Sequence, residues 1–266
     1  KETTNTFYIV SIADANCETI DTVFVDINPL PNANAGADVS ICYGATTQIL
    51  ASGGQYYYWS NNYDTAYMEV YPTTTTTYTL TVIDNNNCSN TDDVVVYVNP
   101  LPIVSAGDDI TICRGDTVQK GFVTATGGIS YSWIPNTEIL DADTDEPILF
   151  PQNNKVYYVY ATDTNGCVGN DTIVVFINPL PVINIGFDSL ICFGDTVRLR
   201  NKLANIGDTY LWSDSSTDSL LVTLPKDTTL YTVTITDINN CVSTAQRQIN
   251  VLPIPFVDAG IDTAIC

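Results

Sequence analysis

A four-residue motif, Asn-Pro-Leu-Pro, recurs along the chain and constrains its fold more than any other feature. The copies begin at Asn28, Asn99 and Asn178, and a degenerate copy, Asn-Val-Leu-Pro, begins at Asn250, so that the intervals are 71, 79 and 72 residues. Such regular recurrence indicates tandem structural units. The 266 residues are therefore predicted to form several small domains rather than one large domain.

Each copy of the motif is followed by the same landmarks in the same order. An Ile-Cys pair comes first, then Tyr-x-Trp, then a Thr-rich run that enters a tyrosine, and finally Asp-x-x-x-Cys. We expect residues 1–28 to be the C-terminal part of a preceding repeat and residues 254–266 to be the start of a following one, both cut from a longer array. Complete immunoglobulin-like repeats are expected at 31–99, 102–178 and 181–251.

Within each repeat the sequence has the pattern of short β-strands. Residues 79–82 and 231–236 alternate apolar side chains with threonine, as strands with one solvent-facing side do. Residues 94–98 and 173–177 are rich in β-branched side chains, which suit strands covered on both faces. About seven short strands per repeat, with a tryptophan on the third and a tyrosine at the start of the sixth, are typical of a small immunoglobulin-like sandwich.

We predict an all-β chain of tandem immunoglobulin-like or PKD-like β-sandwiches, arranged as an extended rod. The rod is expected because two prolines in each four-residue linker favour an extended, polyproline-like backbone. The aromatic landmarks are expected to lie between the two sheets of each sandwich. These predicted core residues are Trp59, Trp133, Trp212, Tyr78, Tyr157 and Tyr231.

The cysteines permit two disulfide frameworks, either of which indicates an oxidising compartment. The first cysteine of a repeat lies in the turn after the first strand, and the second lies in the turn before the last strand. These turns are at opposite ends of such a sandwich, whereas bonded Cα atoms lie about 4.4–6.8 Å apart. A framework that joins successive repeats is therefore favoured.

The two frameworks differ in every pair. The favoured, inter-repeat framework has Cys42–Cys167 and Cys113–Cys241, and leaves Cys17, Cys88, Cys192 and Cys266 without a partner in the segment. The alternative, within-repeat framework has Cys42–Cys88, Cys113–Cys167 and Cys192–Cys241.

The amino-acid composition excludes several classes of function. The chain carries 30 acidic and 9 basic residues, a formal charge of −21, and no histidine. Without histidine there is no Ser-His-Asp or Cys-His relay and no imidazole metal ligand, so we expect no catalytic residues. Nine dispersed cations cannot form the basic surface that nucleic acids or anionic membranes require. No apolar run reaches the roughly 20 residues of a membrane span.

Aspartates recur at equivalent positions in the repeats and leave two interpretations open. They are suited to capping backbone amides in turns. Alternatively, they bind Ca²⁺ at the junctions between repeats, since this cation prefers carboxylate oxygens. No other cofactor is indicated. The candidate ligands are Asp38, Asp109 and Asp188 before the first cysteine, and Asp84, Asp163 and Asp237 before the second.

Taken together, the motifs resemble a known class of repeats. The combination of Asn-Pro-Leu-Pro, Ala-Gly-x-Asp-x-x-Ile-Cys-x-Gly-Asp, Tyr-x-Trp, Thr-Thr-x-Tyr-x-Val-x-x-x-Asp and Asn-Gly-Cys is similar to PKD-like and immunoglobulin-like repeats in giant surface proteins of Bacteroidota. Gliding-motility adhesins of the SprB-like kind are members of that class. The resemblance covers essentially the whole chain, although Ala45 and Asn87 depart from it. It implies type IX secretion, a location at the bacterial cell surface and a role in adhesion or gliding.

The same resemblance suggests O-glycosylation, because the signal used in that phylum is similar to Asp-Ser/Thr followed by a small or aliphatic residue. A Gly-Asp-Thr-Val sequence is also a good turn into a strand, so both interpretations stay open. The candidate hydroxyl residues are Thr22, Thr65, Thr117, Thr172, Ser189, Thr196, Ser219 and Thr263.

These observations predict a non-enzymatic stalk segment of a secreted cell-surface filament or adhesin, which presents a distal binding tip. The expected partners are neighbouring repeats of the same chain, surface polysaccharide or other copies of the filament. Binding to nucleic acid and direct insertion into a membrane are not expected. Two alternatives remain: a glycan-binding module that uses aromatic residues such as Tyr56, Tyr57, Tyr58 and Tyr63, or a spacer within a secreted hydrolase.

Overall fold

The computed structural model describes residues 4–258, 260 and 262, and the regular elements among them are β-strands. None of the described residues belongs to a helix with the length and hydropathy of a membrane span. The chain divides into two compact units. One unit contains the described chain up to Ile103 together with Gly127–Ile129 and Thr162–Gly169, and the other contains the remaining described residues.

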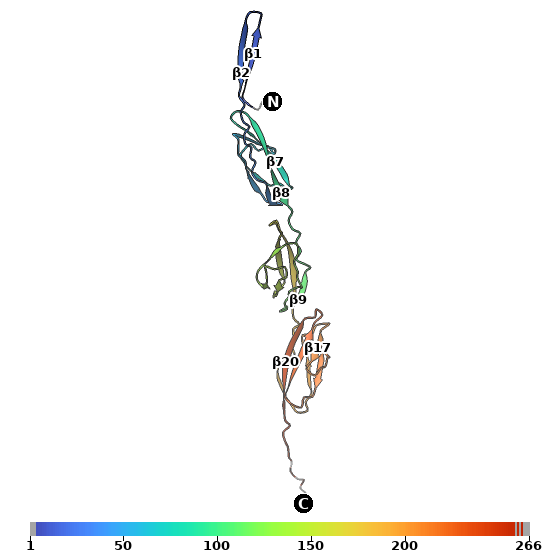
Figure 1. The fold of residues 1–266 in the computed structure, drawn as a ribbon. Coiled ribbons are helices and arrows are strands. Elements are labelled where there is room, and N and C mark those ends of the chain that lie inside the picture. Colours follow the sequence, from blue (N-terminus) through green and yellow to red (C-terminus); the bar gives the residue numbers. More distant parts are fainter. Residues whose placement is uncertain (1–3, 259, 261, 263–266) are drawn as a thin grey trace. The chain divides into compact units, whose positions relative to one another are not determined.

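A two-stranded hairpin begins the first unit (Figure 1). Strands β1 (Thr6–Ala13) and β2 (Glu18–Val25) pair antiparallel, with Tyr8 opposite Val23. The same register recurs in the last two strands of the sandwich that follows. The apolar residues of the hairpin are exposed on both faces. The hairpin thus has the pairing of a sandwich's last two strands, and among the described residues no other strand pairs with it.

Six strands form the first sandwich: β3 (Val39–Cys42), β4 (Thr47–Leu50), β5 (Tyr56–Trp59), β6 (Tyr67–Val70), β7 (Thr76–Ile83) and β8 (Ser89–Asn99). One sheet has the order β3-β8-β7-β5, and the other pairs β4 with β6. Strand β3 runs parallel to β8, whereas the other neighbours are antiparallel. Tyr78, Leu80 and Val82 alternate with threonines along β7, so that one face of this strand is buried in the core beside Trp59.

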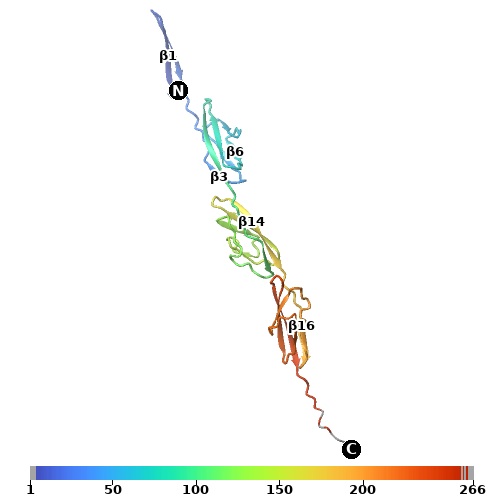
Figure 2. The ribbon, with the colours of Figure 1, turned by 90° about the vertical axis from the view of Figure 1, so that its right-hand side faces the viewer.

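The second sandwich has six strands as well, two of them very short: β9 (Ile110–Cys113), β10 (Ser130–Ile134), β11 (Ile139–Leu140), β12 (Ile148–Leu149), β13 (Lys155–Thr162) and β14 (Val168–Asn178). Its larger sheet has the order β10-β13-β14-β9, with β9 parallel to β14. Strand β14 is labelled in Figure 2. In place of a regular second strand, Val118 forms a single bridge to Leu149. Gly121 then turns the chain with a φ of +86°, which favours glycine.

The third sandwich repeats the pattern of the first: β15 (Ser189–Cys192), β16 (Val197–Arg200), β17 (Thr209–Trp212), β18 (Leu220–Thr223), β19 (Thr229–Thr236) and β20 (Val242–Leu252). One sheet has the order β15-β20-β19-β17, and the other pairs β16 with β18. Strand β15 is parallel to β20. Trp212 packs in the core with Leu199 and Tyr231.

The prediction of an all-β chain of immunoglobulin-like sandwiches is confirmed, with six strands per sandwich where the general immunoglobulin pattern has about seven. In the first sandwich only residues 60–66 separate β5 from β6, too few for the additional strand that immunoglobulin domains have here. The recurring tyrosine consequently lies on the fifth strand and not the sixth. The predicted core residues are all buried: Trp59, Trp133, Trp212, Tyr78, Tyr157 and Tyr231. The exact boundaries of the repeats and the rod-like arrangement stay predictions.

Candidate functional site

The first cysteine of each sandwich is the last residue of its first strand. Cys42 ends β3, where the parallel pairing with β8 places it beside Asn99. The N–H of Tyr43 donates to the Asn99 carbonyl at 2.8 Å, and the N–H of Ala45 donates back to the Cys42 carbonyl at 2.9 Å. Gly44 between them has a φ of +83°. Cys113 and Cys192 end β9 and β15 in the same way.

The second cysteine closes a tight turn that an aspartate holds together. The Asp163 carboxylate accepts hydrogen bonds from the N–H groups of Asn165 and Cys167, both at 2.8 Å. The N–H of Asp163 donates to the Cys167 carbonyl at 2.9 Å. The turns Asp84–Cys88 and Asp237–Cys241 have the same bonds.

Two disulfides join these positions in the structure. Cys42 is bonded to Cys167 and Cys113 to Cys241, with a Cα–Cα distance of 5.5 Å in each case. Cys167 and Cys241 are fully buried. These are the pairs of the inter-repeat framework. Each joins the first cysteine of one sandwich to the second cysteine of the next.

The within-repeat pairs do not occur among the described residues, for a geometric reason. Cys42 lies beside the last residue of β8, whereas Cys88 directly precedes the first residue of that strand. Eleven residues of extended strand separate the two ends by about 35 Å. A disulfide needs Cα atoms within about 7 Å. The pairs Cys42–Cys88, Cys113–Cys167 and Cys192–Cys241 are therefore excluded by the parallel pairing of the first and last strands.

Three of the described cysteines are free thiols: Cys17, Cys88 and Cys192. Cys192 is exposed and Cys88 is half-buried. Cys266 lies outside the described residues.

The aspartates proposed for Ca²⁺ accept hydrogen bonds from backbone amides. The Asp38 carboxylate accepts from the N–H of Val95, at 2.8 Å, and so fixes the start of β3 against β8. Asp109 and Asp188 do the same in the other sandwiches, while Asp84, Asp163 and Asp237 hold the cysteine turns. Among the described residues no three His, Cys, Asp or Glu side chains are grouped to hold a metal. Ca²⁺ takes six to eight oxygen ligands, and its binding to these aspartates stays a prediction.

The described hydroxyl residues proposed for glycosylation lie at the surface. Ser189 is half-buried. The exposed candidates are Thr22, Thr65, Thr117, Thr172, Thr196 and Ser219. Thr263 lies outside the described residues.

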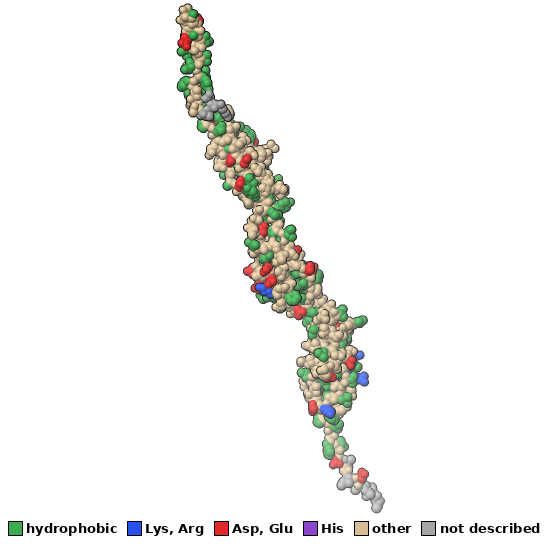
Figure 3. All heavy atoms as spheres, turned by 45° about the vertical axis from the view of Figure 1, so that its right-hand side comes forward, with side chains coloured by type: hydrophobic (Ala, Val, Ile, Leu, Met, Phe, Trp, Pro, Cys, Tyr) green, Lys and Arg blue, Asp and Glu red, His purple; other side chains and the backbone are tan. Residues whose placement is uncertain are grey.

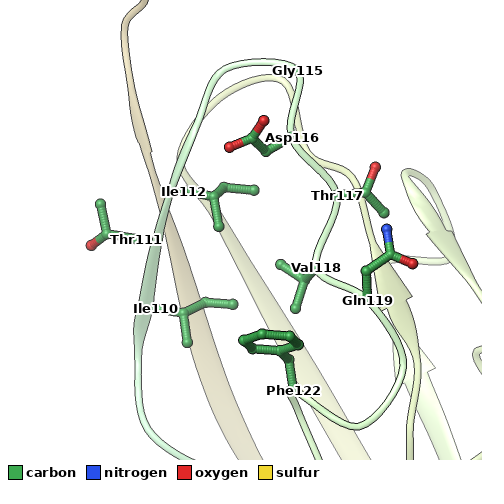
Figure 4. A pocket seen from close by; sticks show the side chains of 9 residues that line it. All are labelled: Ile110, Thr111, Ile112, Gly115, Asp116, Thr117, Val118, Gln119 and Phe122. Carbon is green, nitrogen blue, oxygen red and sulfur yellow. The ribbon is translucent and has the colours of Figure 1, made fainter. Parts of the chain in front are cut away.

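A cavity of about 680 Å³ opens beside β9 in the second sandwich (Figure 4). Ile110 and Ile112 project from β9 toward Val118, and the Phe122 ring closes one end. Phe122 is 80% exposed. This cavity could not be predicted from the sequence, because the cavity arises where the second strand is reduced to the single bridge at Val118.

Charged contacts in the second sandwich are structural. Lys155 forms an ion pair with Glu138 and donates to the Thr137 carbonyl at 2.9 Å. The hydrogen bond from Lys155 holds the pKa of Glu138 below its ordinary value. The Tyr157 hydroxyl donates to the Glu138 carbonyl at 2.9 Å, and burial, with a contribution from the Glu138 charge, raises the pKa of Tyr157. Elsewhere Asp and Glu are spread over the visible face, with few Lys or Arg among them (Figure 3).

Comparison with known proteins yields similarity only at the level of structure. No family model matches the chain, and no curated protein matches it. The I67–I69 fragment of the titin I-band is 11% identical, covers 85% of this chain and 100% of its own, and has a TM-score of 0.42. The titin I9–I11 tandem is 9% identical, covers 93% of this chain and 100% of its own, and has a TM-score of 0.35.

A third similar structure is that of Sidekick-1 immunoglobulin domains 1–5. It is 13% identical, covers 94% of this chain and 67% of its own, and has a TM-score of 0.28. The assignment of the fold rests on the strand order within each sandwich and not on these similarities.

Proposed function

We propose that this chain is a non-enzymatic, tension-bearing segment of a filament or adhesin at a bacterial cell surface. The observation that carries the proposal is that both disulfides join successive sandwiches. A disulfide within one domain stabilises that domain, whereas one between domains couples their mechanical behaviour. Such coupling is useful where a chain is pulled from its ends.

The two disulfides overlap along the sequence, because Cys113 lies between Cys42 and Cys167, and Cys167 lies between Cys113 and Cys241. The shortest covalent path through the chain runs to Cys42, crosses to Cys167, returns to Cys113 and crosses to Cys241. Residues 43–112 and 168–240 lie outside this path. At about 3.3–3.6 Å per residue, a stretched chain then reaches only roughly half of its full contour length before a disulfide must break.

The composition supports a structural role. The formal charge of −21 is spread over successive repeats, which keeps copies apart and soluble. The chain has no histidine. The recurring aspartates are occupied with backbone amides.

The sequence resemblance supplies the more specific part of the proposal: the class of surface protein, its secretion route and its role. Repeats of this kind suggest a giant surface protein of Bacteroidota, exported by type IX secretion and active in adhesion or gliding. We also propose that the repeats span residues 31–99, 102–178 and 181–251 and that they are arranged as an extended rod. The proposed partners are neighbouring repeats, surface polysaccharide or other copies of the filament. Disulfides support an extracellular location, because they persist in oxidising compartments.

O-glycosylation is part of the same proposal. The exposed candidates Thr117 and Thr196 each follow a Gly-Asp pair in a turn, where a modifying enzyme can reach them. The test is the intact mass of the segment purified from cells that naturally produce it. A mass above 29.0 kDa in hexose-sized steps is expected, and the bare mass would refute the modification.

Immunogold electron microscopy of intact cells tests the main proposal. Antibodies against this segment are expected to label filaments that project from unpermeabilised cells. Labelling only after permeabilisation would contradict it, and so would labelling confined to released, isolated molecules.

A second candidate function, glycan binding, is favoured by the cavity beside Phe122. An exposed aromatic face can stack on the C–H groups of a sugar. Asp116 and Gln119 line the same cavity and can accept or donate hydrogen bonds to hydroxyl groups. Calorimetric titration with cellobiose and maltose, on the native chain and on Phe122→Ala, tests this candidate. Weak binding that Phe122→Ala abolishes is expected, and an absence of heat with both sugars would remove the candidate.

A further inference from the structure

The first sandwich contains a pocket of about 230 Å³ beside the end of β6. Its walls come from the loop after β5, from β6 with the residues that follow it, and from β7. The aromatic and polar side chains that line it are Asn61, Tyr63, Glu69, Tyr71 and Tyr78. Tyr63 and Tyr71 are exposed, whereas Tyr78 is buried. The pocket thus combines three aromatic rings with a carboxylate and an amide.

Two polar groups of this pocket have no hydrogen-bond partner among the described residues. One is the Tyr78 hydroxyl. The other is the amide oxygen of Asn61, which is buried, while the amide nitrogen donates to the Met68 sulfur at 3.7 Å. Buried polar atoms are nearly always paired. The two unpaired groups therefore mark a place for a hydrogen-bond donor that the first sandwich does not itself supply.

The second sandwich places an ammonium group beside the corresponding tyrosine. Tyr157 is the third residue of β13, as Tyr78 is the third residue of β7. The Lys155 nitrogen lies 5.5 Å from the centre of the Tyr157 ring and pairs with the Glu138 carboxylate. The same nitrogen donates to the carbonyl and to the hydroxyl of Thr137, both at 2.9 Å. A tyrosine, a carboxylate and the loop after the tryptophan strand therefore hold a lysine ammonium in this sandwich.

The first sandwich has the same kinds of group but no lysine to fill the position. Thr76 is the first residue of β7, the place that Lys155 has in β13. In the third sandwich the corresponding tyrosine is Tyr231, and its hydroxyl is paired with the Thr223 hydroxyl at 3.0 Å. Of these three tyrosines, all in the described part of the chain, only Tyr78 has a hydroxyl without a partner.

The charge around the pocket selects a cation. Residues 31–99 contain no lysine or arginine. They contain six acidic residues: Asp38, Asp64, Glu69, Asp84, Asp92 and Asp93. This uncompensated negative charge repels anions and attracts cations, and tyrosine rings attract an ammonium group by cation–π interaction. We propose that the pocket binds the ε-ammonium group of a lysine side chain on a partner protein. This adds a partner to the proposed function and does not depend on the disulfides.

Each group of the pocket has a part in this binding. Glu69 supplies the opposite charge, and the rings of Tyr63 and Tyr71 contact the ammonium and the methylene groups next to it. The Tyr78 hydroxyl accepts an N–H from the ammonium. Burial, with a smaller contribution from Tyr63, raises the pKa of Tyr78, so that this hydroxyl stays neutral. The amide oxygen of Asn61 adds a partial negative charge to the wall.

The test is an NMR titration of the isotope-labelled full chain with Nα-acetyl-lysine N-methylamide, whose one charge is the ε-ammonium group. Saturable shifts of backbone amides in residues 61–78 are expected. The Nε-acetylated compound lacks the charge and is expected to cause no such shifts. Glu69→Gln and Tyr71→Ala are each expected to weaken binding about two- to fivefold. Both side chains are exposed, so that these substitutions leave the core intact.

The sharpest variant is Thr76→Lys. It puts a lysine where the second sandwich has one, and the new ammonium is expected to fill the pocket and to abolish binding of the probe. Thr77→Lys is the matched control, because it adds the same charge to the opposite face of β7. Asp93→Asn removes a charge at an exposed position outside the pocket. Both controls are expected to keep the affinity of the parent chain.

Several outcomes would overturn the inference. The parent chain could show no saturable shift, or Thr76→Lys and Thr77→Lys could lose binding equally, which would reduce the effect to net charge. Equal binding of the acetylated compound would contradict a role for the ammonium. Glucosamine is titrated in parallel, and tighter binding of this amino sugar than of the lysine compound would assign the pocket to a polysaccharide instead. Melting curves identify any variant that loses binding by unfolding, and the result then rests on Glu69→Gln and Tyr71→Ala.

Discussion

The Cα atoms of Cys42 and Cys167 lie 5.5 Å apart, although 125 residues separate them in the sequence. The first is the end of an edge strand, and the second is the end of an aspartate-bound turn in the next sandwich. Both elements are fixed by backbone hydrogen bonds within their own sandwiches. The disulfide therefore joins two positions that are each held in place within their own sandwich.

The disulfide framework predicts the result of non-reducing peptide mapping. Proteolysis of the oxidised protein is expected to give a Cys42 peptide linked to a Cys167 peptide, and a Cys113 peptide linked to a Cys241 peptide. The measurement is the mass of each linked pair before and after reduction. A Cys42–Cys88 pair in the folded protein would show that the parallel pairing of β3 with β8 is wrong.

The aspartate turn predicts a local loss of stability on substitution. Asp163→Ala removes the acceptor of two backbone N–H groups, which we expect to destabilise the turn by about 1–2 kcal/mol. Hydrogen exchange of peptides from β13 and β14 measures the effect. Asp143→Ala is the matched control, because Asp143 is exposed in the same sandwich; an equal loss in both variants would mean that the turn bonds contribute nothing specific.

The tryptophan in each core predicts a larger effect. Trp133 is almost completely buried, and its indole N–H donates to the Thr144 carbonyl at 2.9 Å. Trp133→Ala is expected to cost about 3–5 kcal/mol, through lost burial and a cavity. The exposed Tyr158 on β13 is the control, for which substitution by alanine is expected to stay within about 0.5 kcal/mol. The measurement is again the exchange protection of β13, and similar effects of the two substitutions would contradict a core role for Trp133.

The ion pair of Glu138 with Lys155 predicts a dependence of stability on pH. The pKa of Glu138 is lower in the folded chain than its ordinary value. Its contribution is therefore complete above that ordinary value and is lost as the pH falls through the folded-state pKa. Glu138→Gln is expected to lower the melting temperature of the second sandwich at pH 7, with an effect that shrinks as the pH falls below the ordinary pKa of a glutamate. Glu69→Gln, at an exposed position on β6, controls for the change in net charge. An effect of Glu138→Gln that does not shrink as the pH is lowered would contradict the ion pair.

Much of the fold could be predicted because the repeat reveals which positions matter. Alternation of threonine with apolar residues located β7 and β19 to within a few residues. The tryptophans were assigned to the cores from their place on the third strand, and all three are buried. These predictions succeed because a half-buried strand imposes a period of two on its own sequence.

The missed features depend on contacts that leave no periodic signal. The segment after β9 is irregular because Gly121 turns the chain and Val118 forms only a single bridge. In the sequence, this segment cannot be told apart from one that contains an ordinary strand. The cavity beside Phe122 was missed for the same reason. The role of the aspartates stayed open until the structure showed their carboxylates on backbone amides, since turn caps and calcium ligands use the same residue.

The central claim, that disulfides between repeats limit how far the chain can be stretched, is tested most directly by single-molecule force spectroscopy in an oxidising buffer. Two variants are compared, each with four cysteines replaced by serine, and Cys17 and Cys266 are replaced in both. Cys88→Ser/Cys192→Ser leaves both inter-repeat disulfides intact, and is expected to stop at roughly half of the full contour length. Cys42→Ser/Cys113→Ser removes both, and is expected to extend fully. If instead Cys88→Ser/Cys192→Ser extends well beyond half of the contour length, the disulfides do not join successive repeats and the account is wrong.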